Sequence, residues 1–229
     1  MNYLKRLFKS IVPVIMYMIL SYLVIFGSFL IYSLFGGTDI LNFVVNYATY
    51  VLVGFNIVYA YYLSKKYRIF CKKTTLVFPF AMLGIAFGCF GNMITFRFNA
   101  VDEVVEMNKL FLILSSVIVG PLVEELLFRN VLVNRLISFN NKIVTILIAS
   151  FVFAIVHSGL YNIIYTFILG IILNTVYVKG KNLLYPLVIH SFANLVVLFL
   201  TEFNVYMLFL SFILLVISMF IVKRDYLLK

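Results

Sequence analysis

Charged side chains are scarce in this sequence, at 11% of its 229 residues, and tryptophan is absent. A soluble domain carries about 25% charged residues, so this chain has too little charge to cover a hydrophobic core in water. Its two cysteines, Cys71 and Cys89, are too few for a disulfide framework, and we expect free thiols. Since 65% of the residues are hydrophobic, we predict an all-α, polytopic integral membrane protein whose solvent is lipid.

The apolar residues fall into eight runs, which predict eight transmembrane helices in a single membrane-embedded domain, 1–229. The first run is about 25 residues long, which exceeds a signal-peptide core, and no small-residue cleavage site follows it, so we expect it to be retained. The third run contains Gly84 and Gly88, a spacing that lets helices approach closely. The runs are 11–35, 41–63, 75–96, 110 to about 138, 143–157, 161–178, 183–200 and 206–222.

Positive charge alternates along the chain. Fourteen of the 18 lysines and arginines lie at the two termini and in every second segment between the runs. Arg129 and Arg135, in the last part of the fourth run, count with the segment that follows it, which makes sixteen, and the other two are Arg97 and Lys109. The positive-inside rule then predicts that both termini are cytoplasmic. This topology, with attraction to anionic lipid, explains the net charge of +10, so we expect the lipid bilayer and no nucleic acid as a partner.

Two adjacent carboxylates, Glu124 and Glu125, interrupt the fourth run within the sequence GPLVEELLFR, 120–129. A carboxylate at bilayer depth costs roughly 2.5 to 3.5 kcal/mol on insertion scales, so an intramembrane pair indicates a functional site. The other six acidic residues fall in loops or close to predicted helix ends.

Both histidines of the chain also lie in apolar runs, and three predicted helices each carry a pair of residues four positions apart. Residues at this spacing share one face of a helix, so the three helices can direct polar faces toward one point. This convergence requires the fourth helix to continue to about Ser138, because otherwise its glutamates would lie far from the histidines in depth. The pairs are Glu125 with Arg129, Phe153 with His157, and His190 with Asn194.

Two kinds of hydrolytic chemistry fit this set of residues. A glutamate beside a histidine can take a proton from water, while a histidine and an amide stabilise the oxyanion of peptide hydrolysis. Alternatively, Glu124, His157 and His190 are possible ligands of a divalent metal such as zinc, which would activate the water. The compact H-E-x-x-H zinc motif is absent, and no cofactor is certain.

The three pairs, in this order, resemble the CPBP family of CAAX-processing and bacteriocin-processing intramembrane proteases, also called the Abi family. The resemblance rests on three motifs: E-E-x-x-x-R from Glu124, F-x-x-x-H ending at His157, and H-x-x-x-N from His190. The matching core covers about 110–200. The family carries the label of metalloproteases, although a metal-free glutamate mechanism is also argued for it.

The resemblance implies an intramembrane endopeptidase that cleaves membrane-associated peptides or proteins at a site open to the cytoplasmic side. It implies that Glu124, with His157, activates water, and that His190 and Asn194 stabilise the oxyanion. Glu125 would support this chemistry, together with Arg129 and Phe153. A composition rich in Lys, Asn, Ile and Phe is typical of a low-GC bacterium, so we expect a multi-pass protein of the bacterial plasma membrane. A role in peptide processing or bacteriocin self-immunity follows.

Other functions remain open at this point. The same residues occur in the proton relays of transporters, although no paired repeat halves are evident here. A non-enzymatic membrane scaffold or immunity protein would use the polar residues for packing, with Glu125 and Arg129 as a structural ion pair.

Overall fold

The computed structural model describes residues 2–43, 47–71, 77–98, 109–199 and 205–222, and within these ranges it contains helices and no strand. Five consecutive elements, from Lys109 to Leu136, form one uninterrupted rod, which we call the central helix. Counting it once, the described ranges hold eight long helical segments, and the predicted all-α fold is confirmed. The elements are α1 (Tyr3–Leu34), α2 (Ile40–Phe43), α3 (Thr49–Lys66), α4 (Val77–Phe98), α5 (Lys109–Ile113), η2 (Leu114–Val119), α6 (Gly120–Glu124), η3 (Glu125–Val133), α7 (Asn134–Leu136), α8 (Lys142–Ile155), α9 (Leu160–Gly180), α10 (Leu184–Phe199) and α11 (Val205–Val222).

Several helix boundaries differ from the apolar runs. Helix α1 begins at Tyr3, eight residues before the predicted span, and α3 continues to Lys66. Lysine and arginine are good helix formers with long apolar stems, so a helix can continue into them beyond the lipid core. The predicted second span corresponds to two elements, α2 and α3, and α8 ends at Ile155, which leaves His157 in the following turn.

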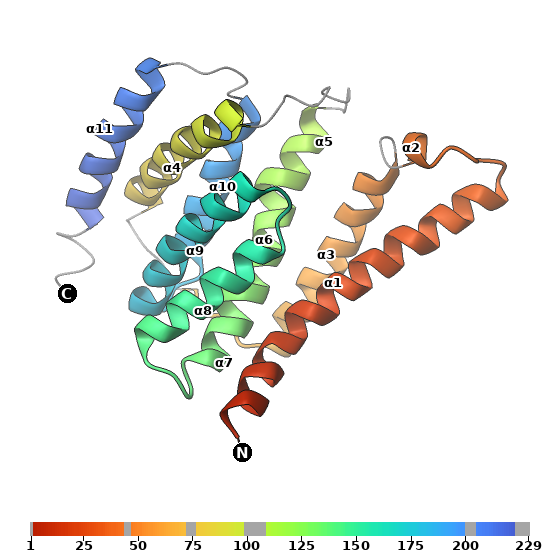
Figure 1. The fold of residues 1–229 in the computed structure, drawn as a ribbon, viewed down its shortest axis with the longest axis horizontal. Helices are drawn as coiled ribbons and strands as arrows, with labels where there is room; N and C mark the ends of the chain where they lie inside the picture. The colour runs from red at the N-terminus through yellow and green to blue at the C-terminus, as the bar shows by residue number, and fades with distance from the viewer. Residues whose placement is uncertain (1, 44–46, 72–76, 99–108, 200–204, 223–229) are drawn as a thin grey trace.

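The central helix lies between two groups of helices (Figure 1). Helices α1 and α3 pack on one side of it, and α8, α9 and α10 pack on the other, while α4 lies between α10 and α11. Within the described ranges, three helices are long and apolar enough to cross a membrane: Tyr3–Leu34, Leu110–Leu136 and Leu160–Gly180. Large apolar side chains are exposed on the outermost helices, such as Phe26 on α1 and Phe209 on α11, which fits a lipid-facing surface.

The two glycines of α4 permit the predicted close helix contact. A Cβ atom on Gly88 would lie 2.6 Å from the carbonyl oxygen of Ala193, and one on Gly84 would overlap the carbonyl oxygen of Ile189. Both carbonyls belong to α10, on either side of His190 in sequence. The glycines therefore fix how closely α10 approaches α4, and with it the position of His190.

Positively charged segments meet at one end of the bundle, which we call the basic end. The N-terminal turns of α1, the 67–71 loop, the 137–142 loop and the 180–183 turn are far apart in sequence but joined by hydrogen bonds. This arrangement matches the alternation of charge along the chain. The bonds are Arg6 Nη2 to Ser138 O (3.4 Å), Arg135 Nη1 to Lys9 O (2.8 Å), Arg135 Nη2 to Tyr67 Oη (3.0 Å) and Leu183 N to Phe70 O (2.7 Å).

Pro13 explains one of these bonds. A proline inside a helix has no N–H to donate to the carbonyl four residues earlier, which here belongs to Lys9. Arg135 donates to that carbonyl from α7. The side chain thereby supplies the missing donor and attaches α1 to the central helix.

Candidate active site

The two glutamates lie where the central helix changes its winding. Glu124 ends α6 and Glu125 begins η3, a π-helical stretch, and a second such stretch, η2, precedes α6. In η2, the N–H of Gly120 donates to the carbonyl of Ser115, five residues back. π-Helical turns are uncommon and frequently occur at functional sites. The predicted continuation of this helix toward Ser138 is confirmed, since it runs unbroken through Leu136.

Glu125 is fully buried and anchors the cluster. Its Oε1 lies 2.9 Å from Nη1 of Arg129, one turn later, and the arginine is also fully buried. The guanidinium carbon lies 4.4 Å from the centre of the Phe153 ring, in a cation–π contact. Breaking a buried pair is costly because it leaves an uncompensated charge. The ion pair is local to η3, and the contact of Arg129 with Phe153 joins η3 to α8.

His190 connects the two glutamates. It is buried on α10, and its Nδ1 donates to Oε1 of Glu125 at 2.8 Å. Its Nε2 faces Oε2 of Glu124 at 3.7 Å, which is too long for a direct hydrogen bond. The predicted meeting of the glutamates with the seventh helix is therefore present, with His190 between the carboxylates.

Phe153 lies at the centre of the site. Its ring contacts Arg129 on one side, and both imidazoles meet it edge-on, with ring centres 4.9 Å away for His157 and 5.8 Å away for His190. Phe128 adds a third edge-on contact at 5.0 Å. Phe153, which was predicted to have a supporting role, thus contacts residues of the central helix and of α10 and the histidine that follows its own helix, α8.

The orientation of His157 is fixed by its own helix. Nδ1 donates to the carbonyl of Phe153 at 2.8 Å, just beyond the end of α8. In the neutral ring this leaves Nε2 as the acceptor, because one nitrogen carries the proton and the other has a lone pair. His157 can therefore accept a proton through Nε2.

Asn194 makes a different contact from the one expected of an oxyanion donor. Its Nδ2 donates to the carbonyl of Ser116 at 2.9 Å, which attaches α10 to η2. An amide has two N–H groups, so one remains for another acceptor. The sequence offered no sign of Ser116 as a partner, because π-helical winding cannot be read from side-chain spacing.

The buried polar atoms that form no hydrogen bond with the described residues at this site belong to both glutamates and to the guanidinium of Arg129. Oε2 of each carboxylate is buried and forms no hydrogen bond with the residues that the structure describes. Glu124 is also the more accessible of the two, with 28% of its side chain exposed against none for Glu125. Glu124 is thus the carboxylate that a water or a substrate can reach.

Tyr17 was not expected at this site. It is close enough to Glu124 to interact with it electrostatically, and its hydroxyl donates to Oδ1 of Asn56 at 2.9 Å. The sequence shows that Tyr17 lies within the first apolar run, but no residue spacing in the sequence predicts that α1 lies near the glutamates.

A metal ion has no ready ligand set in the described ranges. No group of three or more His, Cys, Asp or Glu side chains is placed to hold one there. The three possible ligands, Glu124, His157 and His190, are therefore not placed to bind one metal ion together, and these residues do not fit a zinc site.

Comparison with known proteins gives a match over the central part of the chain. Residues 106–196 match the family model described as type II CAAX prenyl endopeptidase Rce1-like. The membrane peptidase candidate YdiL of Bacillus subtilis is 31% identical over 96 residues, which is 42% of this chain. The UPF0177 protein YxdF of Lactococcus lactis is 40% identical over 79 residues, and the membrane-embedded CAAX protease MroQ of Staphylococcus aureus is 37% identical over 83, each covering 34% of this chain.

The matched stretches span less than half of each relative: 39% of YdiL, 43% of YxdF and 34% of MroQ. No solved structure matches the chain. The similarity therefore covers the central helix to α10, the region that carries the glutamates and both histidines.

Proposed function

We propose that the chain is an intramembrane endopeptidase acting on membrane-associated peptides or proteins, since residues 106–196 match the type II CAAX prenyl endopeptidase (Rce1-like) family model. One observation carries the proposal. His190 on α10 bridges two adjacent carboxylates of the central helix, one fully buried and paired and the other partly exposed. This divides the roles between the carboxylates, since one is held in place and the other is free to react.

In the proposed reaction, Glu124 acts as the general base. A water bound at its Oε2 gives up a proton to the carboxylate and attacks the carbonyl carbon of the substrate. His157, whose Nε2 is free, assists at the same water. The proton then passes from Glu124 to the leaving amine nitrogen as the C–N bond breaks, so the carboxylate is regenerated.

The remaining residues stabilise and position. His190 directs Nε2 toward the reacting region. Because its Nδ1 proton is already donated to Glu125, Nε2 donates to the oxyanion, together with the second N–H of Asn194, only when the ring carries a proton on both nitrogens. Glu125 fixes the orientation of the His190 ring by accepting from its Nδ1, and Arg129 fixes Glu125. Because the described residues include no group of side chains placed to hold a metal ion, the proposed reaction uses no metal.

We further propose that all eight helices cross the membrane and that the basic end is cytoplasmic, with both termini there. The hydrogen bonds that gather four basic segments at one end support this orientation. The substrate would then be a peptide held at the inner leaflet, in peptide processing or bacteriocin self-immunity.

Cleavage of membrane-tethered peptides by the purified full chain tests the proposal. Peptide products would be identified by mass spectrometry for the wild-type protein, for Glu124→Gln, and for the control Asp39→Asn, which removes one charge at an exposed position before α2. We expect Glu124→Gln to lose cleavage by a factor of about 10² or more while remaining folded, and Asp39→Asn to cleave normally. Full activity of Glu124→Gln would overturn the assignment. A scaffold protein would retain its cellular phenotype in that variant.

A further inference from the structure

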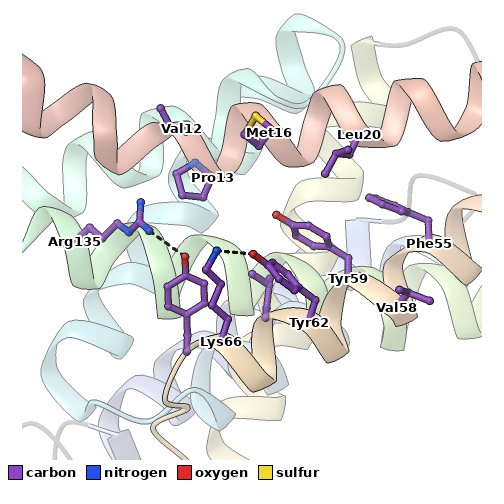
Figure 2. A pocket seen from close by; sticks show the side chains of 12 residues that line it. Val12, Pro13, Met16, Leu20, Phe55, Val58, Tyr59, Tyr62, Lys66 and Arg135 are labelled. Carbon is purple, nitrogen blue, oxygen red and sulfur yellow. Dashed lines mark hydrogen bonds between the residues drawn. The ribbon is translucent and has the colours of Figure 1, made fainter.

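A groove of about 560 Å³ lies between α1 and α3 (Figure 2). Its walls are apolar side chains of the two helices, including Met16 and Leu20 from α1 and Phe55 and Val58 from α3. Its volume is within the usual range of about 300 to 1,000 Å³ for ligand pockets. None of its lining residues belongs to the glutamate–histidine cluster.

The two charged side chains of the groove lie near each other. Figure 2 shows Lys66 of α3 and Arg135 of α7 on the same side, each directed to a tyrosine hydroxyl. Lys66 Nζ donates to Tyr62, and Arg135 Nη2 donates to Tyr67 at 3.0 Å. The bond to Tyr62 raises the pKa of Lys66 above its ordinary value, so the lysine is charged at neutral pH.

A second hollow, of about 420 Å³, adjoins the first and shares Arg135 with it. Arg6, Lys9 and Ser138 also line this hollow. Neither lining includes Asp or Glu, and no ion pair to a described residue involves these four cations. Four positive charges that form no ion pair with the described part of the chain therefore surround the mouth of the groove.

We propose that an anionic phospholipid occupies this site. One acyl chain would lie along α1 and α3, and the phosphate would lie between Lys66 and Arg135, within reach of Arg6 and Lys9. The match is of both shape and charge, because cations between helices at the basic end attract anionic headgroups while the groove accepts hydrocarbon. The inference does not depend on peptide hydrolysis.

A peptide fits the groove less well than a lipid. Every residue of an extended peptide carries an N–H and a C=O that need partners when buried. Most of the lining residues are apolar or aromatic, and the two charged ones, Lys66 and Arg135, lie on the same side (Figure 2). A hydrocarbon chain has no such requirement, and a single charged headgroup needs partners at one point.

Native mass spectrometry of the purified full chain tests the proposal, with phosphatidylglycerol, phosphatidylcholine and glycerol 3-phosphate as separate probes. We expect retained phosphatidylglycerol, with weak retention of the zwitterionic lipid and none of the soluble phosphate. The substitution Lys66→Gln should weaken retention about fivefold, since a basic residue near a membrane surface contributes about 1 kcal/mol. The control Lys65→Gln removes the same charge from the neighbouring residue, which lines neither hollow.

A second pair of variants tests the apolar part. Met16→Trp fills the groove, and Ile15→Trp adds the same bulk beside it; both positions are exposed, at 46% and 41%. We expect Met16→Trp alone to displace the lipid. The proposal would be overturned if Lys65→Gln and Lys66→Gln lost the lipid equally, or if both lipids were retained equally. It would also be overturned if only glycerol 3-phosphate bound, or if Met16→Trp displaced a mass that corresponds to a peptide or to a second copy of the chain.

Discussion

Nδ1 of His190 lies 2.8 Å from Oε1 of Glu125, the same carboxylate oxygen that Nη1 of Arg129 approaches to 2.9 Å. One oxygen atom thus joins α10 to the central helix and compensates a buried guanidinium. Glu124, its neighbour in sequence, keeps Oε2 without a hydrogen bond to any described residue. Adjacent residues of the same type therefore occupy different environments, and they should respond differently to the same substitution.

Glu125→Gln should destabilise the protein by about 3 to 5 kcal/mol, because it leaves Arg129 buried without its counter-charge. Thermal unfolding in detergent, followed by circular dichroism, would measure the loss. Glu124→Gln is the matched control and should change stability by less than about 1 kcal/mol, since that side chain is partly exposed and forms no short ion pair. If both variants unfold at the same temperature, Glu125 is not the anchor.

Phe153→Leu should lower kcat about tenfold with little change in KM. The substitution removes the ring that contacts Arg129 and both imidazoles, and a desolvated cation–π contact alone contributes about 2 kcal/mol. Steady-state kinetics on a cleaved peptide would separate the two constants. Phe151→Leu, at an exposed position two residues earlier on α8, should have no effect. A rise in KM alone would assign Phe153 to substrate binding instead.

Gly84→Ala should destabilise the protein by about 1 to 3 kcal/mol, since its Cβ would overlap the carbonyl oxygen of Ile189 and push α10 away from α4. Gly54→Ala on α3 is the control, because nothing lies within 4 Å of a Cβ placed there. Alanine favours helix over glycine by about 1 kcal/mol, so the control should be neutral or slightly stabilised. Thermal unfolding of both variants checks this, and an equal response would show that the contact is not close.

Arg135→Lys should cost about 1 to 2 kcal/mol, because an ammonium cannot reproduce both the bond to Lys9 O and the bond to Tyr67. The cost should fall when Pro13 is replaced by alanine, which restores an intrahelical donor for the Lys9 carbonyl. A double-mutant cycle in thermal unfolding measures this coupling. Additive effects would show that Arg135 does not compensate for the proline.

Peptide cleavage should survive treatment with a metal chelator. The described His, Cys, Asp and Glu residues include no group of three placed to hold a metal ion, so the proposed chemistry activates water with Glu124 and without a metal. Activity would be measured after dialysis against chelator and after adding zinc back. Loss on chelation with recovery on zinc addition would require the metal mechanism instead.

Much of the fold was predictable because a membrane makes polar residues expensive. Eight apolar runs gave eight long helical segments, and the continuation of the fourth helix beyond Arg129 followed from the need to bring Glu124 to the depth of the histidines. The same cost made Glu124, Glu125 and His190 conspicuous against their apolar surroundings. Their meeting was expected from the spacing on successive helices.

Helix ends were less predictable than helix number. Apolar length does not report where a helix stops once it leaves lipid, so α1 begins earlier and α8 ends sooner than the runs indicate. His157 consequently lies in a turn, where a bond to its own helix fixes the ring.

The sequence by itself determined the kind of protein and the residues of the site, since lipid excludes unpaired charge and helical spacing of three to four residues is fixed by backbone geometry. Only the tertiary structure decided how those residues are paired. Arg129 and His190 both contact the same oxygen of Glu125, and Asn194 donates to the carbonyl of Ser116. Phe153 makes edge-on contacts with both imidazoles. These pairings depend on π-helical winding in the central helix and on how closely the glycines of α4 let α10 approach, which are properties of packing that one-dimensional spacing does not contain.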